Sequence, residues 1–245
     1  MKCLILAAGY ATRLYPLTLH TPKALLDVAG RSILDRLVDK VERVEETDEI
    51  IVVSNAKFYD SFTAWKGGRA SRLRISVLND GSVSNEGRLG AVADIAFAVR
   101  ERSIEDELLV LAGDNLFDFE LACFAAFFRR TGWDCITTHR LGDMSRLRRT
   151  GVIEVDENWR VRSFEEKPAE PKSCFAAPPF YLYRRETLPL VDEFLAGGGD
   201  ADAPGSFIPW LLQRRPVGAF FFEGERYDIG SPLSYEAAQR VFAAR

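Results

Sequence analysis

The sequence is poor in the residues that build most protein metal sites and acid–base catalysts. It has two histidines, and its four cysteines form no C-x-x-C pair. A zinc site built from histidine and cysteine ligands is therefore excluded. We expect the cysteines to be small hydrophobes in a reducing compartment rather than ligands or disulfides.

Long hydrophobic runs and a strong charge of either sign are also absent. No segment approaches the ~20 apolar residues of a membrane span. The apolar start Met1–Ala8 breaks at Gly9, so we expect no signal peptide. With 36 acidic against 32 basic residues and a net charge of −4, the chain has no large basic footprint for nucleic acid. These absences predict a cytoplasmic protein without a membrane or nucleic-acid partner, and they leave a homo-oligomer open.

What remains is the composition of a folded globular protein. The chain has 245 residues, of which 47% are hydrophobic and 28% are charged. A chain of this length buries roughly three quarters of its unfolded surface and needs no disulfide or metal to fold. Because neither a repeat nor a linker interrupts the sequence, we expect a single domain over residues 1–245.

Short apolar runs alternate with helical patterns through the first 140 residues. Strands are predicted at 2–7, 49–54, 73–78, 107–111 and 135–139, and helices at 32–44, 57–65, 89–102 and 120–130. This alternation is typical of βαβ units with a parallel sheet. The run Leu108–Leu111 is apolar at every position, as expected for a central strand covered on both faces.

The pattern changes near Arg140. Strand-like runs at 151–155, 161–165, 180–183 and 217–222 come closer together, with helical patterns at 186–195, 207–213 and 233–243. This predicts an antiparallel extension of the sheet. The expected fold class is α/β, a Rossmann-like three-layer αβα arrangement with a mostly parallel central sheet, divided into lobes 1–140 and 141–245. The glycine-rich stretch 197–205 is predicted to be a loop, either a mobile lid or a surface connector.

The most informative segment follows the first strand. Residues 6–18 read L-A-A-G-Y-A-T-R-L-Y-P-L-T, and P-K-A-L-L follows at 22–26. Small residues at 7–9 leave backbone N–H groups uncovered, and Arg13 and Lys23 place two cations nearby. Neither a dinucleotide fingerprint nor a Walker A loop is present. The residues therefore indicate an anion-binding loop of unstated purpose, or a tight turn with solvated cations.

This segment resembles the signature of the sugar-phosphate nucleotidylyltransferases, also called NDP-sugar pyrophosphorylases, with Ala11 where the family usually has glycine. The resemblance implies a nucleotide-diphospho-sugar transferase fold, with the first lobe binding the nucleotide and the second lobe the acceptor. It implies that Arg13 binds the leaving pyrophosphate and that Lys23 binds the phosphates at the reacting centre. The nucleotide would lie on the backbone of Leu6, Ala7, Ala8 and Gly9.

Two further segments of the resemblance carry carboxylates. Leu109–Asn115 ends an apolar strand in Gly-Asp, and Tyr227–Pro232 resembles the family's D-x-G-T/S-P. A carboxylate at the C-terminal end of a parallel strand faces the ligand crevice of such sheets. The resemblance implies that Asp114 and Asp228 hold Mg²⁺, a hard cation that binds one or two carboxylates together with phosphates.

Residues of the second lobe resemble the family's acceptor site. Glu166-Lys167-Pro168 resembles E-K-P, in which Glu contacts an acceptor hydroxyl and Lys binds the acceptor phosphate. Gly151 begins a segment similar to G-V-V-E, where glycine lets the acceptor sit against the backbone. Pro178-Pro179 stands where sugar-activating members carry glycine, and proline has no N–H to donate. The identity of the acceptor therefore stays open.

The segment Ser84–Ala91 resembles the one that contacts the base, with Gly90 at the family's L-G position. The glutamine usual before it has no secure match, and Asn79 and Asn85 are the candidates. The nucleobase is left open.

The resemblance as a whole implies Mg²⁺-dependent transfer of a nucleoside monophosphate from a nucleoside triphosphate to a sugar 1-phosphate. Arg13, Lys23 and Asp114 would be the catalytic residues. A phosphate nucleophile is already ionised at neutral pH, so the scarcity of histidine fits this reaction. Two alternatives stay open: a cytidylyltransferase acting on a non-sugar phosphorylated acceptor such as phosphocholine, and an inactive nucleotide-sensing regulatory subunit.

Overall fold

The computed structural model describes residues 1–244 and divides the chain into two compact units. Unit 1 comprises Met1–Leu89, Leu111–Leu121 and the C-terminal segment from Glu225, and unit 2 comprises Gly90–Val110 and Ala122–Gly224. Strand β6 (Leu108–Ala112) contributes residues to both units. Among the helices of residues 1–244, none has the length and apolarity that crossing a membrane requires.

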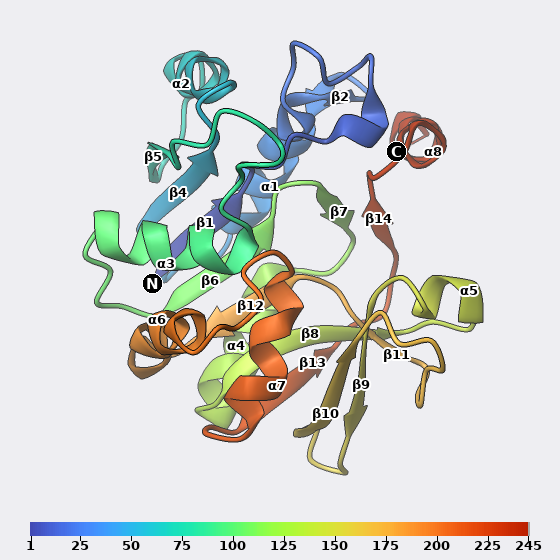
Figure 1. Cartoon of the computed structure of the whole chain (residues 1–245). Coiled ribbons are helices and arrows are strands. Elements are labelled where there is room, and N and C mark those ends of the chain that lie inside the picture. Colours follow the sequence, from blue (N-terminus) through green and yellow to red (C-terminus); the bar gives the residue numbers. More distant parts are fainter. Residues whose placement is uncertain (245) are drawn as a thin grey trace. The chain divides into compact units, whose positions relative to one another are not determined.

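Unit 1 contains a parallel sheet in the order β1 (Lys2–Leu6), β4 (Glu49–Ser54) and β5 (Arg74–Asn79), which Figure 1 shows side by side. Strand β4 is buried along its whole length, which agrees with its apolar sequence. Helices α1 (Ile33–Val41) and α2 (Tyr59–Gly67) connect these strands. Ser32 caps the start of helix α1, because its hydroxyl accepts a hydrogen bond from the Asp35 N–H at 3.0 Å.

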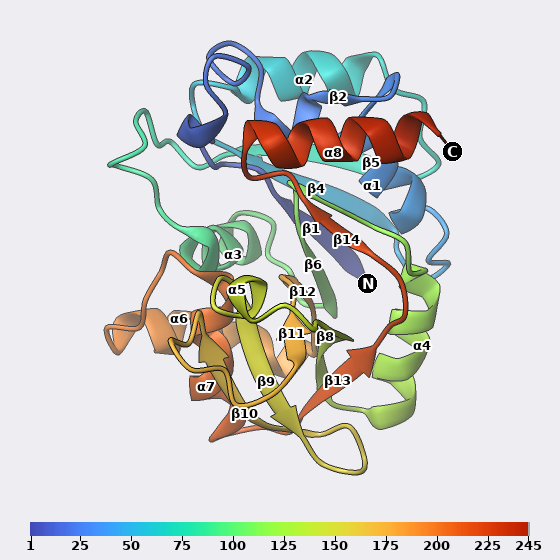
Figure 2. The ribbon, with the colours of Figure 1, turned by 90° about the vertical axis from the view of Figure 1, so that its right-hand side faces the viewer.

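The rest of unit 1 is built from short elements and one terminal helix. Strand β2 (Asp27–Val28) pairs with β3 (Arg31–Ser32), and β7 (Asn115–Phe117) pairs antiparallel with β14 (Arg226–Asp228). Helix α8 (Pro232–Ala243) starts with a capping box between Ser231 and Ser234. Helix α8 lies beside β2 (Figure 2). The side chain of Gln239 connects them, because it accepts from the Ala29 N–H and donates to the Asp27 carbonyl, each at 2.8 Å.

Unit 2 contains the antiparallel strands of the large sheet. Its strands are β8 (Asp134–Arg140), β9 (Gly151–Val155), β10 (Val161–Glu166), β11 (Phe175–Ala177), β12 (Phe180–Tyr183) and β13 (Val217–Phe221). They run in the order β10-β9-β11-β8-β12, with antiparallel neighbours, while β13 lies parallel to β8. The helices are α3 (Ala91–Glu101), α4 (Leu121–Thr131), α5 (Met144–Leu147), α6 (Leu188–Ala196) and α7 (Phe207–Leu212).

These elements confirm the predicted α/β class, with parallel strands flanked by helices and an antiparallel extension. The loop predicted at 197–205 contains one 3₁₀ turn, Pro204–Ser206, and is fixed to the start of α3. The N–H groups of Ala91 and Val92 donate to the carbonyls of Asp202 and Ala201 at 3.2 and 2.9 Å. The segment therefore satisfies helix N–H groups that would otherwise lack partners.

Candidate active site

The loop after β1 leaves an open backbone surface. The Ala7 N–H continues the sheet by donating to Val53 O at 2.9 Å, and the buried Asn55 amide donates to Ala8 O at 2.8 Å. A Cβ built on Gly9 would meet no atom within 4 Å. The segment from Ala7 to Gly9 is thus anchored on one side by the sheet and uncovered at Gly9, which suits close approach of a ligand.

Ala11 adopts a backbone conformation that favours glycine, the residue that the signature it resembles has at this position. Its backbone is left-handed, with φ 48° and ψ 41°, a region that costs a residue with a Cβ about 1–2 kcal/mol. The Thr18 hydroxyl donates to Ala11 O at 2.8 Å and holds this turn. The turn leads directly into the 3₁₀ helix Thr12–Leu14, which carries the exposed Arg13.

Gly113 brings the end of β6 against the end of β1. Its N–H donates to Leu6 O at 2.9 Å, and a Cβ at this position would lie only 2.8 Å from that oxygen. Only glycine permits this approach. The next residue, Asp114, therefore lies beside the loop after β1. Gly113 permits the close approach of the two strand ends, and Asp114 presents its carboxylate there.

Lys23 and Asp114 form a direct ion pair, although 91 positions separate them in the sequence. Lys23 Nζ lies 2.6 Å from Asp114 Oδ2, and their side chains are 12% and 37% exposed. Burial raises the pKa of Asp114, but the Lys23 ammonium and the charge of Arg226 lower it, and the net result lies below the usual range. Asp114 is therefore ionised at neutral pH.

Asp228 is brought next to Asp114 by the pairing of two short strands. It lies opposite Asn115 in the β7–β14 ladder, and the Ile229 N–H donates to Asp114 O at 3.2 Å. A Cβ built on Gly230 would lie 3.5 Å from Asp228 Oδ1 and 3.7 Å from Arg13 Nη2. The structure thus gathers Arg13, Lys23, Asp114 and Asp228 in unit 1, from four separate segments.

Two residues that sequence analysis missed connect the two carboxylates. The buried Asn115 donates from Nδ2 to Asp114 Oδ1 at 2.5 Å and accepts from Arg226 Nε at 2.5 Å. Arg226 Nη2 lies 3.5 Å from Asp228 Oδ2. Asn115 follows Gly-Asp directly and could have been suspected from that position, whereas nothing in the sequence singles out Arg226.

Two carboxylates suit a divalent cation whose remaining coordination positions are filled by phosphate oxygens of a bound ligand. Within residues 1–244, no group of three His, Cys, Asp or Glu side chains gathers as a complete metal site. Asp228 pairs with Asn115 in the β7–β14 ladder, and Asp114 is the residue just before Asn115. Both side chains carry hard oxygen donors, and Mg²⁺ usually binds one or two carboxylates together with phosphates. These two residues could hold such an ion.

The residues predicted to contact the base make local contacts that do not gather them at one place. Asn85 is half-buried in unit 1, and its carbonyl accepts from Arg88 Nη1 at 2.8 Å. Asn79 accepts the Gly81 N–H at 2.9 Å within a turn. Gly90 begins unit 2 with φ 97°, and a Cβ there would overlap the carbonyl of Ala201. Gly90 is therefore required by packing, and its contact with a base stays a prediction.

The residues predicted to bind the acceptor come together in unit 2. Gly151 lies opposite both Glu166 and Ala177 in the antiparallel ladders. A Cβ on Gly151 would lie 2.5 Å from Phe164 Cζ. Glycine is needed at Gly151 because the Phe164 ring covers it, whatever else lies there.

Glu166 and Lys167 project from the end of β10. Lys167 is 60% exposed, has φ 48°, and its Nζ lies 3.5 Å from Glu166 Oε1. Gly205, which sequence analysis did not single out, packs against Glu166 and Phe164: a Cβ there would lie 2.6 Å from both Glu166 Oε2 and Phe164 Cζ. Pro178 and Pro179 follow β11, and Pro178 O accepts the Phe180 N–H at 2.8 Å.

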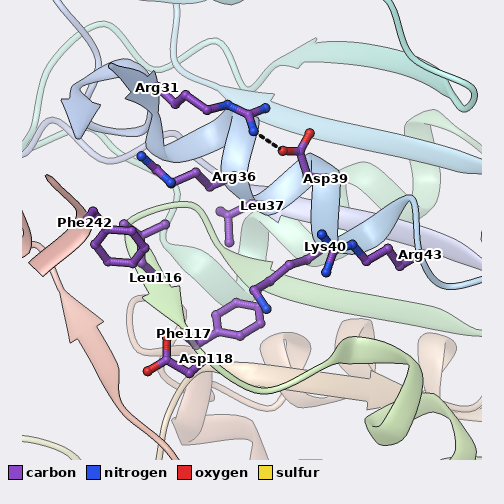
Figure 3. A pocket seen from close by; sticks show the side chains of 10 residues that line it. All are labelled: Arg31, Arg36, Leu37, Asp39, Lys40, Arg43, Leu116, Phe117, Asp118 and Phe242. Carbon is purple, nitrogen blue, oxygen red and sulfur yellow. Dashed lines mark ion pairs between the residues drawn. The ribbon is translucent and has the colours of Figure 1, made fainter. Parts of the chain in front are cut away.

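Unit 1 also contains a basic pocket of about 280 Å³ between α1, β7 and the end of α8, shown in Figure 3. None of the predicted site residues lines it. Its cations already have protein partners: Arg31 pairs with Asp39 at 2.6 Å, and Lys40 donates to Phe119 O at 2.9 Å. The pocket therefore shares only strand β7 with the site and is separate from it.

Comparison with known proteins places this arrangement in a family. A family model described as nucleotidyl transferase matches residues 2–244. The chain is 24% identical over 95% of its length to the bifunctional protein GlmU of Methanocaldococcus jannaschii, and 24% identical over 100% of its length to the UTP–glucose-1-phosphate uridylyltransferase of Synechocystis. It spans 52% and 64% of the lengths of these two relatives.

The fold agrees with that match. The solved structure of a UDP-glucose pyrophosphorylase complexed with UDP-glucose superposes with a TM-score of 0.82 at 19% sequence identity, covering 99% of this chain and 98% of the other. The predicted fold type is thereby confirmed. Because the family model spans nearly the whole sequence, this chain belongs to the nucleotidyl transferase family.

Proposed function

We propose that this member of the nucleotidyl transferase family is a Mg²⁺-dependent sugar-1-phosphate nucleotidyltransferase. It transfers a nucleoside monophosphate from a nucleoside triphosphate to the acceptor phosphate and forms an NDP-sugar. The observation that carries the proposal is the Lys23–Asp114 pair at 2.6 Å. It lies beside the loop after β1, and the Ile229 N–H, next to Asp228, donates to Asp114 O at 3.2 Å. Relatives named for this chemistry support it.

In the proposed reaction an oxygen of the acceptor phosphate attacks the α-phosphorus of the triphosphate. A bond forms between them, and the bond from the α-phosphorus to the pyrophosphate oxygen breaks, so that pyrophosphate leaves with the electron pair. The acceptor phosphate is ionised at neutral pH, and no proton has to be removed. Catalysis then depends on positioning and on offsetting negative charge. Arg13 and Lys23 supply two cations at this site.

Asp114 and Asp228 would hold the Mg²⁺ ion, which when bound supplies charge stabilisation at the phosphates. The chain's own residues prepare that place, because Asp114 is ionised and its two oxygens are oriented by Lys23 and Asn115. The backbone from Leu6 to Gly9 would carry the nucleotide. Retention of both carboxylates and of Lys23 speaks against an inactive nucleotide-sensing subunit.

In unit 2, Lys167 would bind the acceptor phosphate, while Glu166 and Gly151 would contact the acceptor itself. Two observations keep phosphocholine as a second candidate. The Phe164 ring and the Glu166 carboxylate lie together against Gly205, and an aromatic ring beside a carboxylate suits a quaternary ammonium. Two consecutive prolines after β11 also lack the N–H groups that a sugar hydroxyl could use.

The test is release of pyrophosphate by the purified chain over a matrix of nucleoside triphosphates and phosphorylated acceptors. We expect turnover with at least one hexose 1-phosphate, dependent on Mg²⁺. If phosphocholine is turned over with CTP and no hexose 1-phosphate is, the proposed acceptor is wrong and the proposed nucleotidyl transfer stands. Binding of a nucleotide without any turnover would contradict the proposal and favour a sensor.

A further inference from the structure

Arg226 occupies a position that the proposed reaction does not yet use. It lies on β14, two residues before Asp228, and its side chain is only 15% exposed. Its Nε donates to Asn115 Oδ1 at 2.5 Å, and its Nη2 lies 3.5 Å from Asp228 Oδ2. One guanidinium therefore reaches both proposed cation ligands, Asp228 directly and Asp114 through an amide.

The amide of Asn115 fixes the orientation of Asp114. Asn115 is 1% exposed, and its two ends have opposite partners: Nδ2 faces the Asp114 carboxylate and Oδ1 faces Arg226. The guanidinium can only donate, so it holds the amide oxygen on its own side and turns the NH₂ group toward Asp114. Asp114 then has a fixed donor on each oxygen, Asn115 on Oδ1 and Lys23 on Oδ2.

The fixed cations also offset the charge of the carboxylates before anything binds. Lys23 faces Asp114 and Arg226 faces Asp228, so two positive charges balance two negative ones. Arg13, whose Nη2 and Asp228 Oδ1 both lie near Gly230, adds a third positive charge. A site with this balance attracts a free divalent cation weakly. It attracts a cation–triphosphate complex well, since that complex is anionic and brings its own oxygen ligands.

We propose that Arg226 is a positioning residue which aligns Asp114 through Asn115 and keeps the two carboxylates balanced, so that the divalent cation enters only as its complex with the nucleotide. The proposal rests on the proposed function of the site. It concerns the order of binding, and it assigns to Arg226 a role separate from those of Lys23 and Arg13.

The first experiment measures Mn²⁺ binding to the full chain by electron paramagnetic resonance, with and without a non-hydrolysable nucleoside triphosphate. We expect uptake of Mn²⁺ by the protein to be at least about tenfold tighter with the nucleotide, after correction for Mn²⁺ bound to free nucleotide. Equal affinity in the two conditions for the unaltered chain would overturn the proposal without any variant.

The second experiment compares three variants. Arg226→Met should bind free Mn²⁺ about tenfold more tightly than the unaltered chain, because one opposing charge is gone, and its kcat should fall. Arg226→Lys keeps the charge but cannot bridge to Asn115 and Asp228 together, so it should still exclude free Mn²⁺ while losing kcat. Arg74→Met removes an arginine that is 71% exposed on β5 and should change neither quantity.

The outcomes separate this inference from the proposed function. If the unaltered chain turns over substrates and Arg226→Lys matches it in kcat, the positioning role is wrong. If Arg226→Met folds and its Mn²⁺ affinity is unchanged, the charge-balancing role is wrong. If no substrate pair is turned over but Mn²⁺ still enters only with the nucleotide, the proposed reaction fails and the role of Arg226 in cation binding stands.

Discussion

The two units hold their proposed site residues in different ways. In unit 1, polar bonds join segments far apart in the sequence: Lys23 to Asp114 across 91 positions, and Asn115 to Arg226 across 111. In unit 2, Glu166 and Lys167 are chain neighbours placed by one strand end, and their surroundings are set by the packing of Phe164. Charge fixes the first set, whereas backbone shape fixes the second.

The exposure of the two lysines follows the same division. Lys23 is 12% exposed and bound to a carboxylate, while Lys167 is 60% exposed and 3.5 Å from its neighbour Glu166. A partly buried, paired cation is held in a fixed position, which is what selective stabilisation of a transition state requires. An exposed lysine attracts an anion, but its ammonium group is held less firmly in one position. The comparison therefore predicts that substitutions in unit 1 act on kcat and those in unit 2 act on KM.

The largest effect is expected from removing a carboxylate charge in unit 1. Asp114→Asn and Asp228→Asn should each lower Mg²⁺-dependent turnover by about two orders of magnitude or more, the usual loss of a main charge-stabilising element. Circular dichroism should be unchanged. Asp48→Asn is the matched control, since Asp48 is 58% exposed, lies in the same unit and pairs with Lys2. Near-normal turnover in either site variant would remove the two-carboxylate assignment.

A smaller effect should distinguish the two lysines. Lys23→Ala should lower kcat by about tenfold or more with a modest change in the KM of the acceptor, because it removes binding realised in the transition state. Lys167→Ala should leave kcat nearly unchanged and raise the KM of the acceptor. Steady-state kinetics with each substrate varied in turn measures both. A raised KM for the nucleotide in Lys167→Ala, with the acceptor unaffected, would reverse the assignment of the units.

A still smaller effect is expected where backbone shape fixes the site. In Gly205→Ala the new Cβ would come within 2.6 Å of Glu166 Oε2 and Phe164 Cζ, so the carboxylate must move. We expect the KM of the acceptor to rise several-fold, about 1 kcal/mol, with the KM of the nucleotide unchanged. Gly142→Ala is the control in the same unit, because its Cβ would meet no atom within 4 Å. Equal kinetics for the two variants would show that Glu166 does not depend on this packing.

Sequence patterns predicted the long elements well because burial alone determines them. The strand expected at 49–54 is β4 with the same bounds, and the one expected at 151–155 is β9. The helix expected at 89–102 is shorter, Ala91–Glu101, because Gly90 with φ 97° lies outside the helical region. In such segments every position agrees with one periodicity, and no distant contact is needed to decide them.

The parts of the site that escaped prediction depend on distant pairing. Strands β7 and β14 have three residues each, too few to show a period, and only their pairing places Asn115 opposite Asp228. Arg226 is one of many arginines until the structure sets it against Asn115. The individual motif residues could be named from the sequence, while the hydrogen bonds that connect them required the fold.

The smallest expected effect is a change with pH in the free energy of unfolding, and its sign should differ between the two units. In unit 1, burial raises the pKa values of Asp35 and Asp39, but hydrogen bonds and the charge of Arg69 lower them, with a net value below the usual range. Carboxyls with lowered pKa stabilise the fold above their unfolded pKa and lose that contribution as the pH falls. The free energy of unfolding lost in Arg69→Met, about 1 kcal/mol at pH 7, should therefore shrink toward acid.

In unit 2 the sign is reversed at Asp134. Burial raises its pKa, and hydrogen bonds from the Arg184 N–H and the Thr187 hydroxyl offset only part of this. Between the unfolded and the raised folded pKa, the folded state holds a proton that the unfolded state has released. The contribution of Asp134 to stability therefore falls as the pH rises through that interval. Relative to Asp134→Asn, the unaltered chain should gain stability from pH 7 toward pH 4. Urea unfolding of the unaltered chain, Arg69→Met and Asp134→Asn at pH 7 and pH 4 measures both differences in the free energy of unfolding. If the two differences shift in the same direction between these pH values, the expected contrast between the two units is wrong.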